Sequence, residues 1–247
     1  MKKQLLVAAV IAAFSFQAGA ALAATIVAPG SSHDSVNKSL TVGAGTQVKD
    51  VETVNGSIDI ESKASAEEVA TVNGSIDVGD DVSVGSLETV NGSIRAGAGL
   101  KVAADVETVN GRIEIGAGSA VQGSVSTVNG RVQLQQSSVA KNVETVNGGL
   151  SFNGARIGGN VELVNGRADV LEGTIVAGDL IVHKPKGNWG WGNKSKPPVV
   201  VIGAGSEIGG RILVENEKTK LYVHEGARVG SVEGVQAIRF AGANAPE

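Results

Sequence analysis

The hexapeptide Val51-Glu-Thr-Val-Asn-Gly56 decides the fold of this 247-residue chain, because it returns in near-verbatim form six more times. The asparagines of the seven copies, each followed by glycine, are Asn55, Asn73, Asn91, Asn110, Asn129, Asn147 and Asn165. Successive copies are 18, 18, 19, 19, 18 and 18 residues apart. A constant period this short indicates one supersecondary unit stacked many times, which is a solenoid.

Small or aliphatic residues recur every six positions within the period, as at Val54, Ile60, Ala66, Val72 and Val78. Three such steps make one period and predict a coil with three flat sides and one short strand on each side. An α-helical repeat would instead place apolar residues three and four apart. The series also predicts that Val54 and its counterparts, Val109 among them, point inward.

We therefore predict an all-β fold, a single-stranded, three-sided parallel β-helix with about 18–19 residues per turn. Because right-handed crossovers dominate between parallel strands, the coil is predicted to be right-handed. One turn alone buries too little apolar surface to offset the conformational entropy that it loses. A stack can fold because neighbouring turns share their faces and their backbone hydrogen bonds.

The first 23 residues have the organisation of a secretory signal peptide, with Lys2 and Lys3 before an apolar run and Ala21-Leu22-Ala23 at the cleavage site. The expected order is signal peptide 1–23, lead-in segment or N-terminal cap 24–38, β-helix 39–240 and flexible tail 241–247. The mature chain carries no candidate transmembrane segment. We expect an exported protein, in the periplasm, outside the cell or on its surface.

Composition narrows the function classes. The sequence has no cysteine, which excludes disulfides and a lipid-modified cysteine anchor. Hydrophobic residues make up 42% of the chain but aromatic residues only 3%, so the core must be aliphatic. Without Lys2 and Lys3 the chain has 19 basic and 25 acidic side chains, a net charge of −6, which argues against a nucleic-acid partner.

Residues 184–198 (KPKGNWGWGNKSKPP) interrupt the periodicity. Proline and glycine at this density cannot hold a strand ladder, so the segment must leave the coil as a loop. Its candidate binding residues are Trp189, Trp191, Lys184, Lys186, Lys194 and Lys196. These side chains could stack on sugar rings and contact anionic groups of cell-wall glycan, lipopolysaccharide or a membrane surface. The alternative is a loop whose tryptophans pack back on the coil.

The seven Asn-Gly pairs are interpreted as a structural corner. Asparagine and glycine both tolerate left-handed backbone, which suits a turn of the chain. Stacked asparagine amides can also hydrogen-bond along the coil axis, as they do in cross-β ladders. A column of glutamates next to them is interrupted by Ala70 and Ser126, which limits the direct stacking of like charges.

The remaining polar residues do not converge on a catalytic pattern. Asp77, Asp80 and Asp81 form the tightest acidic group, but Asp80-Asp81 stands where other turns carry Gly-Ala-Gly. Such carboxylates could serve calcium or polysaccharide chemistry, but a turn is the simpler interpretation. The histidines, His33, His183 and His224, show no metal-ligand spacing, although His183 and His224 could approach in space. We predict no catalytic residue, no metal site and no cofactor.

The three-part turns resemble those of bactofilins, the bacterial polymer-forming cytoskeletal proteins. The resemblance covers residues 39–235 and is carried by the phrases Gly43-Ala-Gly-Thr-Gln-Val48, Gly203-Ala-Gly-Ser-Glu-Ile-Gly-Gly210 and Gly226-Ala-Arg-Val-Gly-Ser231. It implies a right-handed triangular β-helix that joins end to end into filaments without nucleotide. Two departures are the signal peptide, since bactofilins work in the cytoplasm, and the Thr-Val-Asn-Gly repeat with its tryptophan insert. The phrase Val-Asn-Gly-Ser-Ile is also similar to bacterial adhesin-type β-repeat proteins.

The sequence thus favours an exported, non-enzymatic structural or scaffolding β-helix of the cell envelope. Such a protein could self-associate through its ends, whose unpaired strand edges are templates for another copy. The second hypothesis is an adhesin or glycan-binding module that uses the loop at 184–198. The third, a polysaccharide-active enzyme, lacks a convergent set of residues.

Overall fold

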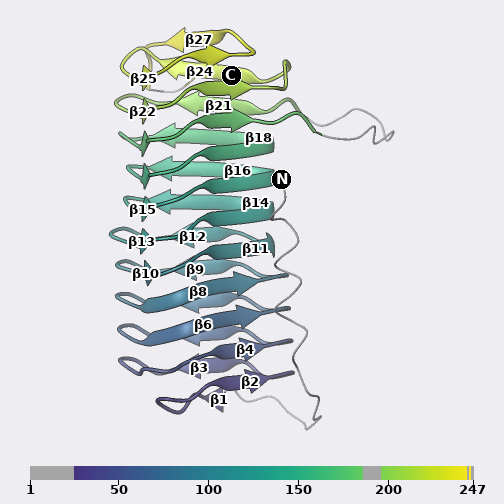
Figure 1. The fold of residues 1–247 in the computed structure, drawn as a ribbon, viewed down its shortest axis with the longest axis vertical. Helices are drawn as coiled ribbons and strands as arrows, with labels where there is room; N and C mark the ends of the chain where they lie inside the picture. The colour runs from purple at the N-terminus through teal and green to yellow at the C-terminus, as the bar shows by residue number, and fades with distance from the viewer. Residues whose placement is uncertain (1–24, 186–195, 244, 246–247) are drawn as a thin grey trace. The chain divides into compact units, whose positions relative to one another are not determined.

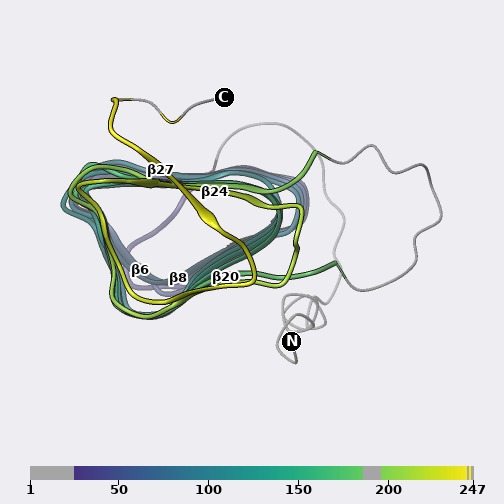
Figure 2. The ribbon, with the colours of Figure 1, turned by 90° about the horizontal axis from the view of Figure 1, so that it is seen from above.

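The computed structural model describes residues 25–185, 196–243 and 245, and this part of the chain is built from 27 short strands (Figure 1). Contacts divide the chain into two compact units, Met1–Gly123 (unit 1) and Ser124–Glu247 (unit 2). Each unit is a parallel β-solenoid whose turns follow a three-sided outline (Figure 2). None of the described residues forms a helix with the length and apolar character that a membrane crossing requires.

Unit 1 contains strands β1–β13. Its first side consists of β2 (His33–Ser35), β4 (Val51–Thr53), the second halves of β6 (Ser65–Thr71) and β8 (Ser83–Thr89), and β11 (Val106–Asn110). Its second side consists of β1 (Thr25–Ile26), β3 (Leu40–Val42), β5 (Ile58–Ile60), β7 (Ile76–Val78), β9 (Ile94–Ala96) and β12 (Ile113–Ile115). The third side consists of the first halves of β6 and β8, β10 (Lys101–Val102) and β13 (Ala120–Val121).

Unit 2 contains strands β14–β27. Three long strands run along the first and second sides: β14 (Val125–Gln135), β16 (Val143–Asn153) and β18 (Val161–Leu171). The first side continues with β20 (Leu180–Val182), β23 (Ile212–Val214) and β26 (Val232–Glu233), and the second with β21 (Val199–Ile202), β24 (Lys220–His224) and β27 (Ala237–Phe240). The third side has β15 (Ser138–Val139), β17 (Arg156–Ile157), β19 (Ile175–Val176), β22 (Glu207–Ile208) and β25 (Arg228–Val229).

Equivalent residues of successive turns lie side by side in both units. Val51 pairs with Val69 in unit 1, and Val143 pairs with Val161 in unit 2. These registers confirm the predicted three-sided parallel coil with 18–19 residues per turn. The handedness of the coil stays a prediction.

The interior of the first side differs from the prediction. Val51 and Thr53 are buried, whereas Val54 is only half-buried, and three turns later Val106 and Thr108 are buried and Val109 is half-buried in the same way. The six-residue series is therefore wrong for this side, because the strand alternates from Val51 and the fourth residue faces away from the core. On the second side the prediction is confirmed, since Ile58 and Ile60 are both buried.

Left-handed backbone occurs at the corner between the second and third sides. Positive φ angles occur there at Gly45 (67°), Lys63 (64°), Asp81 (58°) and Gly99 (73°) in unit 1, and at Gly154 (64°) and Gly205 (70°) in unit 2. Among the described Asn-Gly pairs, in contrast, only the glycine at 166 has a positive φ, 122°. The expectation that the Asn-Gly corner uses left-handed backbone is therefore wrong for the other pairs.

The first turn of unit 1 and the last turn of unit 2 differ from the other turns of their units. At the start of unit 1, β1 and β2 already pair with β3 and β4, so the lead-in segment 24–38 includes strands of the coil. His33 and Ser35 there pair with the inward residues Val51 and Thr53. At the end of unit 2, the exposed Arg239 pairs with buried Val223.

The end of unit 2 carries a second, outer hydrophobic cluster. Val201, Tyr222 and Phe240 are buried together, although β21 and β24 direct Val201 and Tyr222 away from the interior. Ala245, in the segment predicted as a flexible tail, packs against this cluster.

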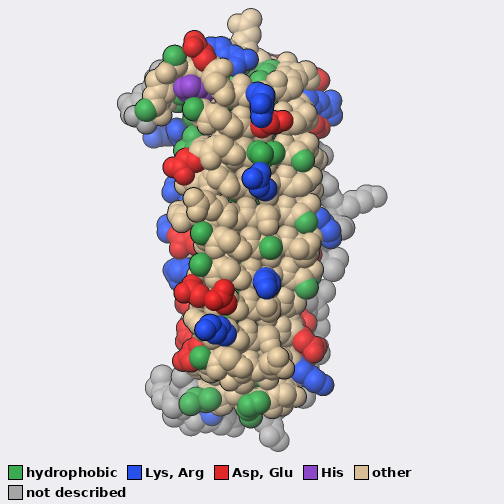
Figure 3. Space-filling model, turned by 90° about the vertical axis from the view of Figure 1, so that its left-hand side faces the viewer, with side chains coloured by type: hydrophobic (Ala, Val, Ile, Leu, Met, Phe, Trp, Pro, Cys, Tyr) green, Lys and Arg blue, Asp and Glu red, His purple; other side chains and the backbone are tan. Residues whose placement is uncertain are grey.

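On the third side, acidic and basic side chains are interspersed over the surface (Figure 3).

Candidate functional site

The insert at 184–198 takes the place of an Asn-Gly corner. In the turn before it, β18 continues around Asn165-Gly166 from the first side to the second. In the next turn, Val182 pairs with Leu163 and Val199 pairs with Arg167. Counting from these pairs, Lys184 stands at the asparagine position and Pro198 at the glycine position. The loop is therefore an enlarged version of the repeated corner.

The candidate binding residues of the insert divide into two groups. Lys184 and Lys196 lie at its two roots and are exposed. Trp189, Trp191, Lys186 and Lys194 lie outside the described residues. The two lysines that can be placed are thus those at which the insert joins the coil.

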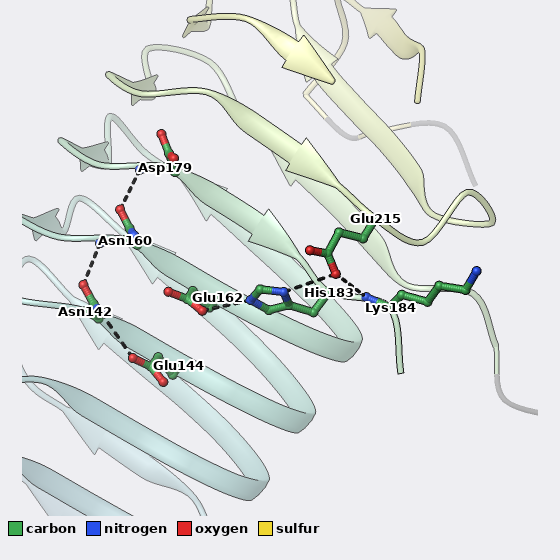
Figure 4. Close-up of polar contacts among 8 residues, drawn as sticks. All are labelled: Asn142, Glu144, Asn160, Glu162, Asp179, His183, Lys184 and Glu215. Carbon is green, nitrogen blue, oxygen red and sulfur yellow. Dashed lines mark hydrogen bonds and ion pairs between the residues drawn. The ribbon is translucent and has the colours of Figure 1, made fainter. Parts of the chain in front are cut away.

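A histidine between two carboxylates stands at the first root of the insert (Figure 4). Nε2 of His183 lies 2.9 Å from Oε2 of Glu162, which belongs to β18 in the turn below. Nδ1 of His183 lies 3.4 Å from Oε2 of Glu215, which follows β23 in the turn above. The same oxygen of Glu215 accepts a 3.1 Å hydrogen bond from the backbone N–H of Lys184. The group therefore ties three successive turns together where the chain leaves the coil.

The second root is held by the backbone. Pro198 is buried, and its carbonyl accepts a 3.0 Å hydrogen bond from the N–H of Lys220. Both roots are therefore bonded to the turn above, at Glu215 and at Lys220. This arrangement presents a loop from a fixed base and leaves the coil on either side of it intact.

A polar column runs along the corner before the first side of unit 2 (Figure 4). Oδ1 of Asn142 accepts the N–H of Asn160 at 2.9 Å, and Oδ1 of Asn160 accepts the N–H of Asp179 at 2.9 Å. Arg211 completes the column by donating its backbone N–H at 3.0 Å and its Nε at 3.1 Å to Asp179. These hydrogen bonds, the backbone one first, lower the pKa of Asp179. Asn142 also donates to Glu144 at 3.3 Å.

The repeated asparagines form amide ladders within each unit. In unit 1, Nδ2 of Asn73 donates to Oδ1 of Asn55 at 2.8 Å, and Asn91 donates to Asn73 at 2.9 Å. In unit 2, Asn147 donates to Asn129 and Asn165 donates to Asn147, both at 3.0 Å. The ladder of unit 1 also reaches down to Asn37, whose copy of the repeat is degenerate. Asn73 and Asn147, which lie inside these ladders, each donate to one neighbouring turn and accept from the other.

Close packing requires the glycine in six of the seven Asn-Gly pairs, namely Gly56, Gly74, Gly92, Gly111, Gly148 and Gly166. A Cβ on Gly92 would overlap the carbonyl oxygen of Gly74 in the turn below, and Gly74 stands in the same relation to Gly56. The freed space admits the buried threonines. Thr89 donates its hydroxyl to the carbonyl of Gly74 at 3.0 Å, and Thr108 donates to that of Gly92 at 2.9 Å. Buried hydroxyls are tolerated when they are hydrogen-bonded in this way.

The acidic column on the first side of unit 1 is longer than expected. Asp34 pairs with Glu52, Ala70 follows, and Glu88 pairs with Glu107 above it. Burial, and then the nearby charge of Glu107, raise the pKa of Glu88 to about 6. Ala70 separates the two acidic pairs, as the interrupted glutamate column predicts.

Replacing Glu88 with glutamine is expected to stabilise the protein at pH 7.5 by about 1 kcal/mol after allowance for solvent screening. A carboxyl whose pKa is higher in the folded than in the unfolded state makes folding less favourable as the pH rises from about 4.5 to about 6. The gain should therefore disappear at pH 4, as urea unfolding at both pH values would show. Glu67→Gln, at an exposed position of β6 in the same unit, is the control and should bring no gain. An equal gain from Glu88→Gln at both pH values would contradict the assignment.

The other acidic and histidine candidates have structural partners. Arg95 lies 3.3 Å from Asp77 in the turn below and 3.9 Å from Glu114 in the turn above. Oδ1 of Asp80 accepts the N–H of Ala98 at 2.7 Å, and Asp81 occupies the left-handed corner. Within the described ranges, no group of three or more His, Cys, Asp or Glu side chains could hold a metal ion.

The remaining histidines lie apart from the insert. Nε2 of His33 lies 2.8 Å from Oγ of Ser31, in the first turn of unit 1. Nδ1 of His224 accepts the N–H of Gly226 at 2.9 Å, and its ring meets Phe240 edge to face. Sequence reasoning missed the pairing of His183 with Glu162 and Glu215. No motif in the sequence indicated this pairing, because the two partners lie 21 and 32 residues away from His183.

Comparison of the chain with protein-family models, with curated proteins and with solved structures found no match.

Proposed function

We propose that the mature chain is an exported, non-enzymatic scaffold of the bacterial cell envelope. The observation that carries this proposal is the use of outward polar side chains. The asparagine ladders, the column from Asn142 to Asp179 and the pairs of Arg95 bond mainly to neighbouring turns of the coil. Side chains engaged in this way stabilise length and stiffness, which are the properties that a scaffold needs.

Self-association through the ends of the coil is the specific form of this proposal. The two exposed large hydrophobic side chains among the described residues are Ile26 in β1 and Ile238 in β27, exposed by 78% and 46%. They occupy the equivalent outward position of the repeat, in the first and the last strand of the second side. Pairing of β1 from one copy with β27 of another would extend both strand edges and stack the two isoleucines.

Sedimentation velocity of the mature protein, beginning at Ala24, tests this proposal. We expect concentration-dependent assemblies of the wild type and a monomer for Ile238→Asp, because a charge in the contact must lose its water. Gln122→Asp, which adds a charge at an exposed position of unit 1, is the control and should assemble like the wild type. A wild-type protein that stays monomeric at every concentration would contradict self-association.

Glycan binding by the insert is the second candidate, and the doubly anchored corner favours it. A loop with both roots bonded to one turn can offer Trp189 and Trp191 to a sugar surface at a fixed place on the coil. A binding assay tests this candidate: the protein is pelleted with peptidoglycan sacculi and, separately, mixed with lipopolysaccharide. Trp189→Ala/Trp191→Ala should lose this binding and keep the assembly state; equal binding by wild type and variant excludes the insert.

A further inference from the structure

We propose that His183 is a pH-dependent clasp, which fastens the first root of the insert to the turn above when the imidazole is protonated. The clasp consists of Glu162, His183, Glu215 and the backbone N–H of Lys184 (Figure 4). This role belongs to the coil itself and goes beyond the scaffold function. It holds whether or not copies of the chain assemble.

The geometry places a carboxylate oxygen beside each nitrogen of one ring. Oε2 of Glu162 lies 2.9 Å from Nε2, and Oε2 of Glu215 lies 3.4 Å from Nδ1 on the opposite side of the imidazole. A neutral imidazole carries one N–H and presents a lone pair at the other nitrogen, whereas the imidazolium donates from both. Only the protonated His183 can therefore donate to both carboxylates at once. Histidine side chains ordinarily change charge between pH 5 and 8.

The contact with Glu215 is the one that deprotonation releases. The shorter contact, to Glu162, keeps the remaining proton on Nε2, so the lone pair at Nδ1 faces the Glu215 carboxylate and repels it. Because the same oxygen of Glu215 accepts the N–H of Lys184, its departure also frees that amide. The root of the insert then loses its side-chain bond to the turn above.

The charged groups around His183 come from three turns. Glu162 extends from β18 below it and is followed one turn further down by Glu144. Glu215 extends from the end of β23 above it, and Lys184 is its neighbour on its own turn. Of these groups, the two that contact the ring are both carboxylates. Protonation of His183 therefore adds an attraction to each neighbouring turn.

Amide hydrogen exchange of Lys184, measured by NMR on the full mature chain, tests the clasp. Protection factors, which correct for the intrinsic effect of pH, should be about two- to fivefold higher at pH 5.5 than at pH 8.0, the range expected for a partly exposed ion pair. His183→Gln should make the protection of Lys184 independent of pH. His224→Gln, at a histidine outside the clasp, should leave the dependence intact.

A second variant and a spectroscopic signature keep the test decisive. Glu215→Gln removes the carboxylate and should also abolish the pH dependence, whether or not His183→Gln folds. Nitrogen chemical shifts of the imidazole report how many ring nitrogens carry a proton, and the protection of Lys184 should follow the doubly protonated form. Equal protection of Lys184 at the two pH values in the wild type, or a pH dependence that survives in both variants, would overturn the proposal.

Discussion

Replacing Gly92 with alanine is expected to destabilise the protein by about 2–4 kcal/mol, as urea unfolding followed by circular dichroism would show. The added methyl group would overlap the carbonyl oxygen of Gly74, a backbone atom of the turn below. That turn cannot move away without straining the asparagine ladder, in which Asn91 donates to Asn73. Movement of Gly92 itself would also break the hydrogen bond that its carbonyl accepts from Thr108.

Two other glycines of unit 1 are matched controls. A Cβ on Gly43 would meet only Oγ1 of Thr46, at an ordinary 3.4 Å, so Gly43→Ala should be neutral or slightly stabilising. Gly45 has space around it but a φ of 67°, so Gly45→Ala should cost about 1 kcal/mol. The expected order of destabilisation is therefore Gly92, Gly45, Gly43. If Gly45→Ala and Gly92→Ala cost the same, steric overlap would not explain the glycine at position 92, and backbone conformation would be the better explanation of the Asn-Gly corner.

The fold could be predicted because the period is visible in the sequence. Each turn repeats the same pattern of aliphatic residues, and the pairing of Val51 with Val69 follows from spacing alone. The buried threonines could not be predicted in the same way. Hydrophobicity patterns class Thr108 as polar, and its burial depends on the carbonyl of Gly92 in the preceding turn. Such a partner becomes visible only once the turns are stacked.

Local propensity also misdirected the assignment of corners. Asparagine and glycine tolerate left-handed backbone, but that is not why glycine stands in most of these pairs. Glycine stands there because the carbonyl of the turn below leaves no room for a Cβ. The left-handed positions lie at another corner, where Lys63 and Asp81 adopt them as well as glycines. Because residues other than glycine occupy these positions, composition alone marks this corner poorly.

At the candidate site, too, some features could be predicted from the sequence and others could not. Proline, glycine and tryptophan density predicted the loop, and its replacement of an Asn-Gly corner could have been counted from the register of the strands. The contacts of His183 could not, because its partners lie 21 and 32 residues away in sequence. The insert lengthens one of these separations beyond the repeat period. A residue of this kind is found by stacking the turns and not by searching for motifs.

Replacing Val106 with aspartate is expected to unfold unit 1, whereas the same change at Val109 should cost about 1 kcal/mol. Val106 is 0% exposed and pairs with Leu87, which is also 0% exposed. A carboxylate at this place has no partner, and an unpaired buried charge costs several kcal/mol or forces the group to take up a proton. Val109 is half-buried and faces away from the core, so its aspartate can reach water.

Thermal and urea unfolding of the two variants separates these outcomes. Loss of the turn at Val106 removes one of the two neighbours of the turn that contains Leu87, which keeps only its pairing with the turn of Val69, and a turn with fewer shared faces offsets less of its own entropy. The damage should therefore spread along unit 1 and lower the cooperativity of unfolding, as well as its midpoint. Should Val106→Asp fail to fold, Val106→Ala provides a graded measurement, with an expected loss of about 2 kcal/mol. A larger loss at Val109 than at Val106 would mean that the six-residue series, and not the alternation from Val51, marks the interior.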